Sequence, residues 1–477
     1  MSRLWTSLCS LAFLAAHAIQ YFMRSDRQFA PRTVRQLLSS FALLAGVLAS
    51  LGALAESQPA LRFSGSGNPM VCLNSLQPFG YGLSAGLSGS ARYDVDPFRN
   101  GGSDLDVMPK RRLIGIRSSG FGCIRMAIDI GALMAAPNEP ALDRLVEQLA
   151  TGISRRLSVG LKVIVDIHPL PAGLHPVSGF SDIDIIDGPD GAKFRRLIEV
   201  VTRLGESIRL RFQPSDVALE LFNEPPPPNA FASKTAWNIQ IETYWRHMRR
   251  VLPDHTLIVA GTGFAAIDGT MTGRPRRGGL IDLRPRNFDA NTGYAFHPYE
   301  SPLFTHQATP GFFSHVRGLT FPAAKHPGGQ KKAESDFIAE VNSDKSLSVW
   351  DKAKMIADFV GTPRHSYSFS RYWRNFGNLE ALATRLAVVT DWAKSHGVKR
   401  SQLMNTEFGV NRTQQSCEKA APQDSAVAFI KAIRIASNQA GIGLITVHEV
   451  QGSCFAISNN APPFEFDEDV LAALGLK

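Results

Sequence analysis

Two short apolar segments of this chain each carry a glutamate, and together these side chains could hydrolyse a glycosidic bond. Residues 219–225 read Leu-Glu-Leu-Phe-Asn-Glu-Pro, and residues 405–410 read Asn-Thr-Glu-Phe-Gly-Val. The apolar residues predict buried strands, and Pro225 ends the first one because proline cannot continue a sheet ladder. Glu224 and Glu407 would then stand at the C-terminal ends of two strands, where parallel barrels place catalytic groups. Two carboxylates facing one bond are what sugar hydrolysis requires.

Apolar runs rich in β-branched residues alternate with amphipathic segments along most of the chain. We predict strands at residues 71–76, 123–129, 162–168, 219–224, 256–261, 293–299, 405–410 and 443–449. We predict helices at residues 108–120, 141–158, 193–210, 234–251, 378–396, 425–439 and 467–475. This alternation predicts βαβ units and an α/β fold with a parallel sheet. About eight repeats favour a closed (β/α)8 TIM barrel, and the glycine pattern of dinucleotide-binding folds is absent after the early strands.

A long segment, about residues 300–377, interrupts the alternation after the sixth predicted strand. Loops of this length in a compact domain are usually functional. The segment is an insertion that could close one end of a substrate groove. It is rich in aromatic residues, namely Phe304, Phe312, Phe313, Trp350, Tyr367, Phe369, Tyr372, Trp373 and Phe376.

Five motifs in one order give the chain a resemblance to glycoside hydrolase family 5, the cellulase family, over about residues 70–475. An Asn-Glu-Pro triplet alone would recur by chance, whereas five motifs at barrel spacing are specific. The motifs are Arg125 in the second strand, His168 at the end of the third, Asn223-Glu224-Pro225 after the fourth, His297-Pro298-Tyr299 after the sixth, and Glu407 in Thr-Glu-Phe-Gly on the seventh.

The resemblance implies a retaining glycosidase whose two carboxyl groups have different roles. Glu224 would protonate the leaving oxygen and later activate water, while Glu407 would attack the anomeric carbon as the nucleophile. Glu407 must be ionised, and Arg125 would hold it so as a permanently charged donor. Tyr299 could donate a hydrogen bond to the same carboxylate. Because the protein supplies acid, base and nucleophile, we expect neither a cofactor nor a metal.

Further polar residues would bind the sugar. Asn223 would contact the 2-hydroxyl, a hydrogen bond that strengthens in the transition state. His168 and His297 would line the subsite of the cleaved sugar. Glu220 has the same strand parity as Glu224 but would lie in a deeper layer. We interpret it as structural and paired to a base inside the barrel.

The end of the eighth strand departs from the pattern of the family. A tryptophan usually lies there and forms a stacking floor under the cleaved sugar, whereas this chain has Thr446-Val447-His448-Glu449. His448 would take the place of the tryptophan, with less stacking area and a ring that can titrate near neutral pH. A charged or substituted sugar at that subsite is then plausible. Glu449 could instead pair with His448 and keep it protonated.

The first functional hypothesis is an exported retaining β-glycosidase, most simply an endo-β-1,4-glucanase acting on cellulose or a bacterial exopolysaccharide. A β-mannanase, or an exo-acting β-glucosidase or exoglucanase of the same family, is the second, because loops decide among substrates. A transglycosylase would differ only in how well water is excluded. A catalytically inactive carbohydrate-binding barrel is the hypothesis from another class, and the presence of both glutamates disfavours it.

The composition argues against a nucleic-acid partner. The chain has 477 residues, 44% hydrophobic and 19% charged, as in ordinary globular proteins, with a formal net charge of +9. Basic residues are scattered and no nucleic-acid fingerprint is present, so the charge indicates solubility rather than nucleic-acid binding. We expect a monomer that binds a polysaccharide or an oligosaccharide.

The N-terminus predicts a targeting segment. Four arginines within residues 24–35 precede an apolar stretch at 37–49, which leads to Ala53-Leu54-Ala55, a small-x-small cleavage pattern. We therefore predict a signal peptide over residues 1–55, a single catalytic domain over 56–477, and a secreted or periplasmic protein. Met23 could be the true start. The other interpretation is an uncleaved anchor, the only case in which the protein would contact a membrane.

Four cysteines would remain after cleavage, an even number that allows disulfides in an exported chain. Cys417 and Cys454 follow the seventh and eighth predicted strands, so neighbouring loops could bring them together, and we favour this pair. Cys123 lies inside a predicted strand and could be a buried thiol. Cys72 has no assigned partner.

Overall fold

The structure is a computed structural model, and it describes most residues from 61 onward. The predicted targeting segment and the alternative start at Met23 lie outside the described residues. The chain divides into two compact units, residues 1–58 and 59–477, and all described residues belong to the second unit. The described ranges are 61–65, 69–75, 83–84, 92–93, 108–169, 187–231, 236–269, 278–361, 367–413, 417–450, 454–458 and 465–477.

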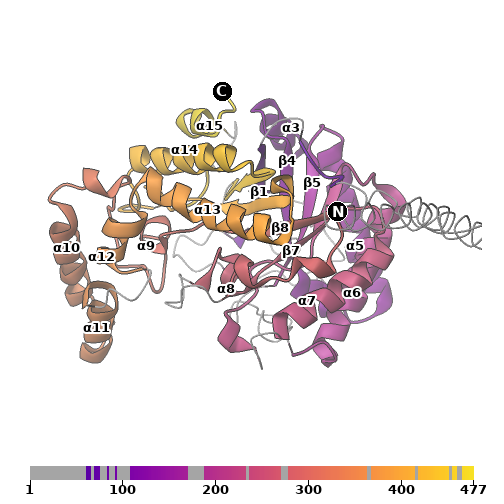
Figure 1. Cartoon of the computed structure of the whole chain (residues 1–477), viewed down its shortest axis with the longest axis horizontal. Helices are drawn as coiled ribbons and strands as arrows, with labels where there is room; N and C mark the ends of the chain where they lie inside the picture. Colours follow the sequence, from indigo (N-terminus) through magenta and orange to yellow (C-terminus); the bar gives the residue numbers. More distant parts are fainter. Residues whose placement is uncertain are drawn as a thin grey trace, which may run out of the picture. The chain divides into compact units, whose positions relative to one another are not determined.

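Eight parallel strands close into a barrel in the order β1-β10-β9-β8-β7-β6-β5-β4 (Figure 1). The predicted (β/α)8 barrel is therefore confirmed. The barrel strands are β1 (Met70–Ser75), β4 (Cys123–Asp129), β5 (Lys162–His168), β6 (Val217–Glu220), β7 (Leu257–Ala260), β8 (Thr292–Phe296), β9 (Leu403–Phe408) and β10 (Leu444–Val447). A separate pair, β2 (Leu83–Ser84) and β3 (Arg92–Tyr93), is antiparallel.

The barrel strands are apolar because parallel strands covered by helices are buried on both faces. Every described position of β6, β7, β8, β9 and β10 is buried. Phe63, which is fully buried, belongs to the apolar cluster inside the barrel, together with Ile164, Ile258 and Met404. The interior is thus packed, and polar side chains toward the C-terminal strand ends are available for a site.

Helices follow the strands as predicted, with ends shifted by one or two residues. Asn138 caps α5 and Asn378 caps α13 by accepting hydrogen bonds from the first helical turn. The helices around the barrel are α3 (Lys110–Ser118), α4 (Ile130–Met134), α5 (Glu139–Leu157), α6 (Ala192–Arg211), α7 (Ala236–Val251), α8 (Thr262–Ala265), α13 (Leu379–His396), α14 (Gln423–Ala440) and α15 (Glu468–Leu474). Among the described residues, none of these helices has the combined length and hydropathy needed to cross a membrane.

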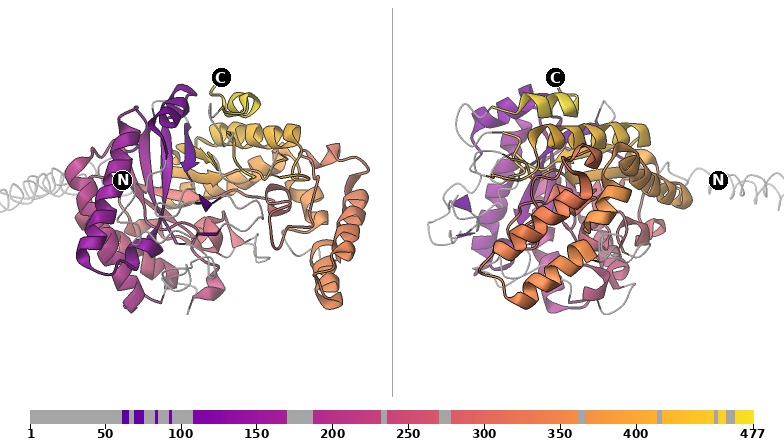
Figure 2. Two further views of the ribbon diagram at one scale, coloured as in Figure 1. Left: turned by 180° about the vertical axis from the view of Figure 1, so that it is seen from behind. Right: turned by 90° about the vertical axis from the view of Figure 1, so that its left-hand side faces the viewer.

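The insertion after β8 is helical rather than an extended loop. It contains α9 (Pro302–Thr305), α10 (Gly329–Ser343), α11 (Val349–Ile356) and α12 (Phe369–Arg371). Figures 1 and 2 show α10, α11 and α12 gathered at one side of the barrel. Many of its aromatic residues form their own core, in which the Phe359 ring lies 4.9 Å from Phe312 and from Phe337.

Two disulfides join segments that are distant in the sequence. Cys417 and Cys454 are bonded, which confirms the favoured pair of loops after β9 and β10. Cys72 is bonded to Cys123, so the interpretation of Cys123 as a buried thiol is wrong. The physical reason is register, since Cys72 on β1 lies directly opposite Cys123 on β4, with 4.6 Å between the Cα atoms.

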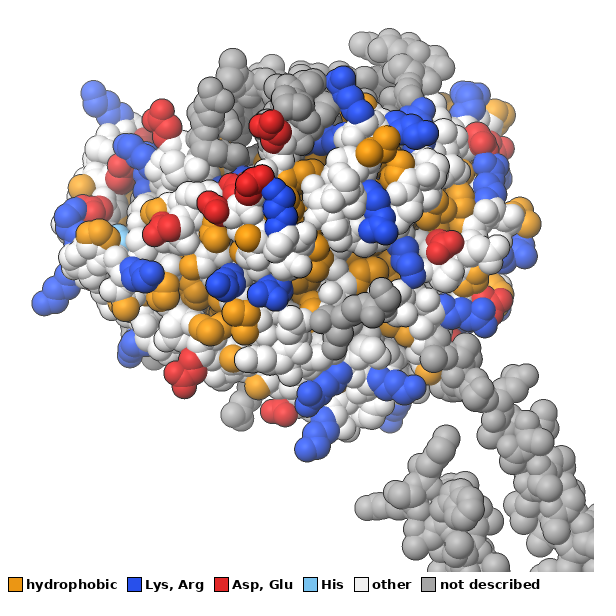
Figure 3. Space-filling model, turned by 90° about the horizontal axis from the view of Figure 1, so that it is seen from above, with side chains coloured by type: hydrophobic (Ala, Val, Ile, Leu, Met, Phe, Trp, Pro, Cys, Tyr) orange, Lys and Arg blue, Asp and Glu red, His pale blue; other side chains and the backbone are white. Residues whose placement is uncertain are grey.

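The surface carries charges of both signs. On the face seen in Figure 3, Lys and Arg side chains alternate with Asp and Glu and with scattered apolar groups. This mixture agrees with the interpretation of the net positive charge as a solubility feature.

Candidate active site

Both predicted catalytic glutamates lie at the C-terminal end of the barrel, but only one lies on a strand. Glu407 is the fifth residue of β9, whereas β6 ends at Glu220, so the prediction that Glu224 lies on a strand is wrong. The main chain keeps its hydrogen bonds to both neighbouring strands as far as Asn223. It then turns at Glu224, whose φ of 43° is left-handed. An uncommon backbone conformation of this kind is often found at functional sites.

Glu407 is 7% exposed and accepts three hydrogen bonds. Arg125 Nη1 and Asn74 Nδ2 each donate to Oε2 at 3.0 Å, and Tyr299 donates its hydroxyl to Oε1 at 2.9 Å. Burial opposes ionisation of the carboxyl, but His448 in its protonated form at low pH, His297 and Arg125 together hold the pKa of Glu407 well below its usual range. The residue is therefore ionised, as a nucleophile must be. The predicted contacts of Arg125 and Tyr299 with this carboxylate are both present.

Arg125 is fully buried and is the centre of a carboxylate network. Its guanidinium contacts Glu220 at 2.7 Å, Glu407 at 3.0 Å and Asp166 at 3.1 Å. Burial by itself would lower the pKa of Arg125, but the three carboxylates outweigh burial and raise it. The prediction that Glu220 pairs with a base inside the barrel is confirmed. Arg125 keeps its charge and fixes the position of the nucleophile.

Glu224 has one hydrogen-bond partner among the described residues, His297, whose Nδ1 lies 2.9 Å from Oε1. His297 Nε2 lies 3.0 Å from Thr406 Oγ1, and the Thr406 hydroxyl donates its only proton to Glu220. Thr406 can therefore only accept from His297, so Nε2 is protonated. An unprotonated Nδ1 and an ionised Glu224 carboxylate could both only accept. The hydrogen bond between them therefore requires one further proton, which the two groups share. A carboxyl group that holds an exchangeable proton is what a general acid requires.

Asn223 and His168 form the wall beside Arg125. Asn223 Oδ1 accepts from Arg125 Nη2 at 2.8 Å, which fixes the amide orientation and leaves Nδ2 as a donor. That Nδ2 lies 3.3 Å from His168 Nε2, and His168 Nδ1 lies 2.8 Å from Asp166. Burial lowers the pKa of His168, but Asp166 outweighs it and the pKa is raised. The structure thus brings all eight predicted site residues to one end of the barrel.

Comparison with known proteins identifies the family. A family model described as Cellulase (glycosyl hydrolase family 5) matches residues 113–445, which contain both glutamates and Arg125. The chain belongs to glycosyl hydrolase family 5.

Relatives of this family 5 chain include fungal proteins over part of its length. It is 28% identical over 164 residues to a probable glucan 1,3-beta-glucosidase A of Neosartorya fischeri, covering 33% of this chain and 38% of that protein. It is 30% identical over 116 residues to the protein of the same name from Aspergillus fumigatus, covering 24% of this chain and 27% of that protein. The chain therefore spans less than two fifths of the length of either relative.

Solved structures of other proteins share the fold. A cellulose synthase subunit Z from Clostridioides difficile superposes with a TM-score of 0.55 at 18% identity, covering 86% of this chain and 99% of that chain. The endoglucanase Cel5A of Thermotoga maritima superposes with a TM-score of 0.53 at 15% identity, covering 85% and 96%. At such identities the likeness establishes the barrel architecture.

His448 takes the place of the tryptophan that is usual in the family, and its hydrogen bond defines its protonation state. Asn74 Nδ2 lies 3.0 Å from His448 Nδ1 and also donates to Glu407, so Nδ1 must accept and the ring is neutral. Burial and the charge of Arg125 outweigh the attraction of Glu407 and lower the pKa of His448 to about 4. The prediction that His448 titrates near neutral pH is therefore wrong. Glu449 does not keep it protonated, because its carboxylate lies 3.9 Å from Nε2.

Five residues near the predicted site were missed by sequence reasoning. Asn74, Asp166 and Thr406 bond directly to site residues, while His306 and Phe455 pack beside Tyr299 at ring distances of 4.8 and 6.2 Å. Strand parity could have found Asp166, since residues two apart face the same way. Gly409 also belongs to the nucleophile segment, because a Cβ there would lie 2.4 Å from the carbonyl oxygen of His448.

Glu224, His297 and Glu407 offer ligand atoms within 4.8 Å of one another, a spacing that could hold a metal ion. Hydrogen bonds within the protein already engage these groups, and a ligand set of two carboxylates and one imidazole lacks the local pattern of a zinc enzyme. Glu224 contacts His297, and Glu407 accepts from Arg125, Asn74 and Tyr299.

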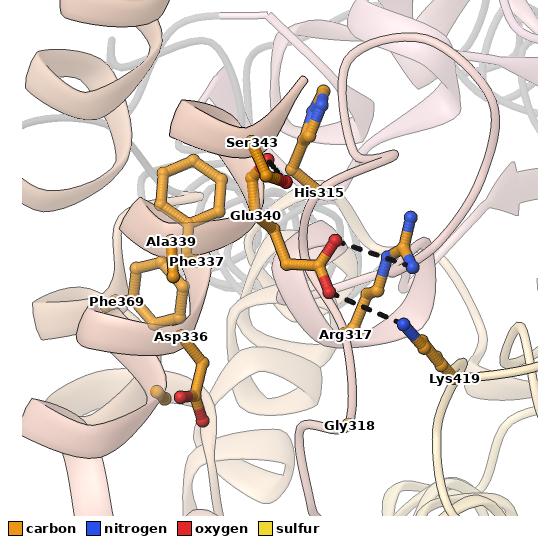
Figure 4. A pocket seen from close by; sticks show the side chains of 11 residues that line it. His315, Arg317, Gly318, Asp336, Phe337, Ala339, Glu340, Ser343, Phe369 and Lys419 are labelled. Atoms are coloured by element: carbon orange, nitrogen blue, oxygen red, sulfur yellow. Dashed lines mark hydrogen bonds and ion pairs between the residues drawn. The ribbon is translucent and has the colours of Figure 1, made fainter. Parts of the chain in front are cut away.

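A cavity of about 570 Å³ lies in the insertion and contains none of the predicted site residues. In Figure 4 the carboxylate of Glu340 on α10 faces both Arg317 and Lys419. Each of these two cations lies 3.6 Å from it. Glu340 therefore forms ion pairs with Arg317 and Lys419, and the predicted catalytic carboxylates lie outside this cavity.

Proposed function

We propose that this family 5 enzyme hydrolyses a β-linked glucan by double displacement with retention of configuration. The observation that carries the proposal is the spacing of the two glutamates, whose nearest carboxylate oxygens lie within 4.8 Å. Retaining glycosidases separate their carboxyl groups by about 5–5.5 Å, whereas inverting enzymes leave about 6.5–9.5 Å for a water molecule. The observed spacing favours direct attack by one carboxylate.

In the first step Glu407 attacks the anomeric carbon while Glu224 gives its proton to the glycosidic oxygen. The bond from the anomeric carbon to the leaving oxygen breaks, and an ester bond to Glu407 forms. In the second step Glu224 removes a proton from water, the water oxygen attacks the anomeric carbon, and Glu407 leaves as a carboxylate. The contrast between the hydrogen-bonded nucleophile and the proton-sharing pair of Glu224 and His297 supports this division of roles.

The remaining site residues fit the same reaction. Arg125, Tyr299 and Asn74 stabilise the carboxylate of Glu407 when it attacks and when it leaves. Asn223 has a donor available for the sugar 2-hydroxyl, while His168 and His297 line the subsite. Because His448 is neutral, we propose that this subsite accepts an uncharged sugar rather than a charged one.

The substrate that we favour is a β-glucan such as cellulose or a bacterial exopolysaccharide, cleaved within the chain. Solved family members named endoglucanases support it, as does the Thermotoga maritima enzyme described in complex with cellobiose. An exo-acting β-1,3-glucanase is the second candidate, supported by the fungal relatives and by the helical insertion beside the barrel. The same Thermotoga maritima enzyme is also described with mannotriose, which leaves a β-mannanase as a third candidate.

We also propose that the protein is exported. The cleavage pattern at Ala53-Leu54-Ala55 and the two disulfides support an oxidising compartment. N-terminal sequencing of the mature protein tests this, with Glu56 expected as the first residue.

The test of the enzymatic proposal is hydrolysis by purified residues 56–477 of β-1,4-glucan, β-1,3-glucan, mannan and bacterial exopolysaccharide, with the anomeric configuration followed by NMR. We expect cleavage of a β-glucan with a β-configured first product. A first product of α configuration would contradict double displacement.

A further inference from the structure

Phe455, in the segment that follows β10, packs against three rings close to the nucleophile. Its ring centroid lies 5.2 Å from that of His448, 5.3 Å from that of His306 and 6.2 Å from that of Tyr299. The interplanar angles are 79°, 65° and 78°, which is the edge-to-face geometry that aromatic pairs prefer. Phe455 is 9% exposed, so its ring is a packed part of the site rather than a surface group.

Two of these rings set hydrogen bonds to Glu407. The hydroxyl of Tyr299 donates to Oε1 of Glu407 at 2.9 Å. His448 Nδ1 accepts from Asn74 Nδ2, which also donates to Oε2 of Glu407. Phe455 therefore packs against side chains whose positions determine two of the hydrogen bonds that Glu407 accepts.

Hydrogen bonds to the main chain hold Phe455 in one place. The N–H of Arg412 donates to the carbonyl of Cys454 at 3.0 Å, and its guanidinium donates to the carbonyl of Ala456 from Nε at 2.9 Å and from Nη2 at 2.6 Å. The N–H of Glu449 donates to the carbonyl of Phe455 itself at 3.4 Å. Because the carbonyls on both sides of Phe455 are engaged, its ring cannot move away without breaking hydrogen bonds.

A disulfide and a glycine attach Phe455 to the loop after β9, the strand that carries Glu407. Cys454, the residue before Phe455, is bonded to Cys417 on that loop. Gly409, two residues after Glu407, leaves room for the ring, because a Cβ there would lie 3.1 Å from Cδ1 of Phe455. Both features fix the ring relative to the nucleophile.

We propose that Phe455 is a positioning residue for the nucleophile and that the disulfide at Cys454 holds it in place. The inference rests on the proposed function, in which Glu407 attacks the anomeric carbon. Phe455 makes no bond to the sugar in this proposal, and instead keeps Tyr299 and His448 where they support the carboxylate. A misplacement of about 1 Å can lower a rate by about a hundredfold, so packing behind the donors contributes to catalysis. Full activity then requires the oxidised disulfide.

Kinetics of Phe455→Leu test the positioning role. We expect kcat/KM to fall by about tenfold or more on both cellopentaose and β-cellobiosyl fluoride, because both substrates need Glu407. Laminaripentaose and β-laminaribiosyl fluoride are the matched substrates for a β-1,3-specific enzyme. A loss confined to the pentasaccharide would overturn the proposal, because Phe455 would then act on the leaving-group side, and so would unchanged activity on both substrates.

Two further variants control for the fold. Phe455→Met fills a similar volume without a ring and should behave like Phe455→Leu, which covers the case in which the leucine variant does not fold. Phe288→Leu is the matched control, because it removes a ring that packs on Trp245 at 5.3 Å, before the start of β8. This control should keep the wild-type kcat/KM on both substrates.

A double-mutant cycle separates positioning from a merely structural role. Tyr299→Phe removes the hydroxyl that Phe455 positions. In that background Phe455→Leu should cause a loss of kcat/KM that is smaller by about threefold or more than its loss in the wild type. Equal fold-losses in the two backgrounds would overturn the proposal, since a structural defect would act independently of the hydroxyl.

Loss of the disulfide should act through the same ring. The double variant Cys417→Ser, Cys454→Ser should lower kcat/KM by about threefold or more, and adding Phe455→Leu should lower it by less than about twofold further. Unchanged activity of the serine variant, or a full additional loss with leucine, would overturn the proposal.

Reduction of the wild type tests the same bond without a substitution. Dithiothreitol opens a disulfide by exchange, so that Cys417 and Cys454 become thiols and the reductant becomes a disulfide. Cys417 is 9% exposed and Cys454 is half-buried, whereas Cys72 and Cys123 are fully buried, so the bond at Cys454 should open first. Alkylation and mass spectrometry identify the opened bond. Activity should fall as it opens, and undiminished activity with this bond open would overturn the proposal.

If the wild-type enzyme cleaves neither pair of substrates, the proposed function fails independently, and crystal structures decide the positioning role. The Tyr299 hydroxyl lies 2.9 Å from Oε1 of Glu407 with Phe455 in place. In a crystal structure of Phe455→Leu these two atoms should lie more than about 3.5 Å apart, beyond hydrogen-bond distance. An unchanged distance would overturn the proposal.

Discussion

Glu407 and Glu224 take part in the same proposed reaction, but the fold holds them differently. Glu407 lies on β9, is 7% exposed and accepts hydrogen bonds from Arg125, Asn74 and Tyr299. The side chain of Glu224 is 31% exposed, lies on a turn and contacts His297.

The difference follows from what each role requires. A nucleophile must stay ionised and keep one position, so rigid donors on strands suit it. A group that gives a proton and later takes one from water must remain accessible and must not be held in one charge state. One barrel end therefore contains a fixed half around Glu407 and an exchangeable half around Glu224.

The largest expected effect is at the fixed half. Glu407→Ala should lower kcat by at least about 10⁴-fold, because no other group can form the covalent intermediate. Adding azide with a β-glycosyl fluoride should restore turnover and give an α-glycosyl azide, since azide would occupy the face that Glu407 leaves empty. Proton NMR of the product measures the configuration. A β-glycosyl azide would contradict the nucleophile assignment.

Glu224→Ala should have a smaller effect that depends on the leaving group. For an unactivated oligosaccharide we expect a loss of about 10²- to 10⁴-fold, the usual contribution of general acid–base catalysis. For a β-glycosyl fluoride the first step needs no proton, so azide should accelerate the second step and give a β-glycosyl azide. The opposite product configurations from the two alanine variants would establish that the two halves have different roles.

Sequence patterns could predict the barrel and both glutamates, but not that the fold holds the two glutamates differently. Buried parallel strands are visible as continuous apolar runs, and the position of Glu220 four residues before Glu224 correctly predicted a paired carboxylate inside the barrel. The turn at Glu224 was missed because a left-handed φ at a non-glycine residue has no periodicity.

Contacts across the barrel were missed for a different reason. Asn74 on β1 and Thr406 on β9 reach the site through contacts between strands that are far apart in the sequence. Cys72 and Cys123 likewise pair through the register of β1 against β4, which residue spacing does not reveal.

The neutral state of His448 gives a pH-dependent prediction for the fixed half. Its pKa is about 4 in the folded protein and 6.5 ordinarily, so the unfolded chain takes up a proton that the folded protein does not. This contribution destabilises the fold progressively as the pH falls from about 6.5 towards 4, by at most about 3 kcal/mol, since one pKa unit corresponds to about 1.4 kcal/mol. Above pH 6.5 it has no effect.

Denaturant unfolding of the wild type and of His448→Gln at pH 7 and pH 4.5 measures this contribution. The variant keeps an acceptor for Asn74 but cannot titrate, so it should lose less stability between the two pH values. Equal losses of stability in both proteins would mean that the fold does not keep His448 neutral, so that the fixed half would contain a histidine that can take up a proton.

The smallest expected effect is at the bridge between the halves. Thr406 accepts from His297 and donates to Glu220, and it thereby links the proton-sharing pair to the carboxylate network of Arg125. Thr406→Val keeps the shape and removes both hydrogen bonds, so kcat should fall about threefold to tenfold, the usual net contribution of a hydrogen bond.

Substrates with different leaving groups determine which half depends on this bridge. If Thr406 supports the proton donor, Thr406→Val should lower kcat/KM for an unactivated oligosaccharide more than for a β-glycosyl fluoride, whose first step needs no proton. Thr406→Ser keeps the hydroxyl and should restore the wild-type rates. Equal losses on both substrates would break the comparison, because Thr406 would then act on the nucleophile through Glu220 and Arg125 rather than on the proton donor.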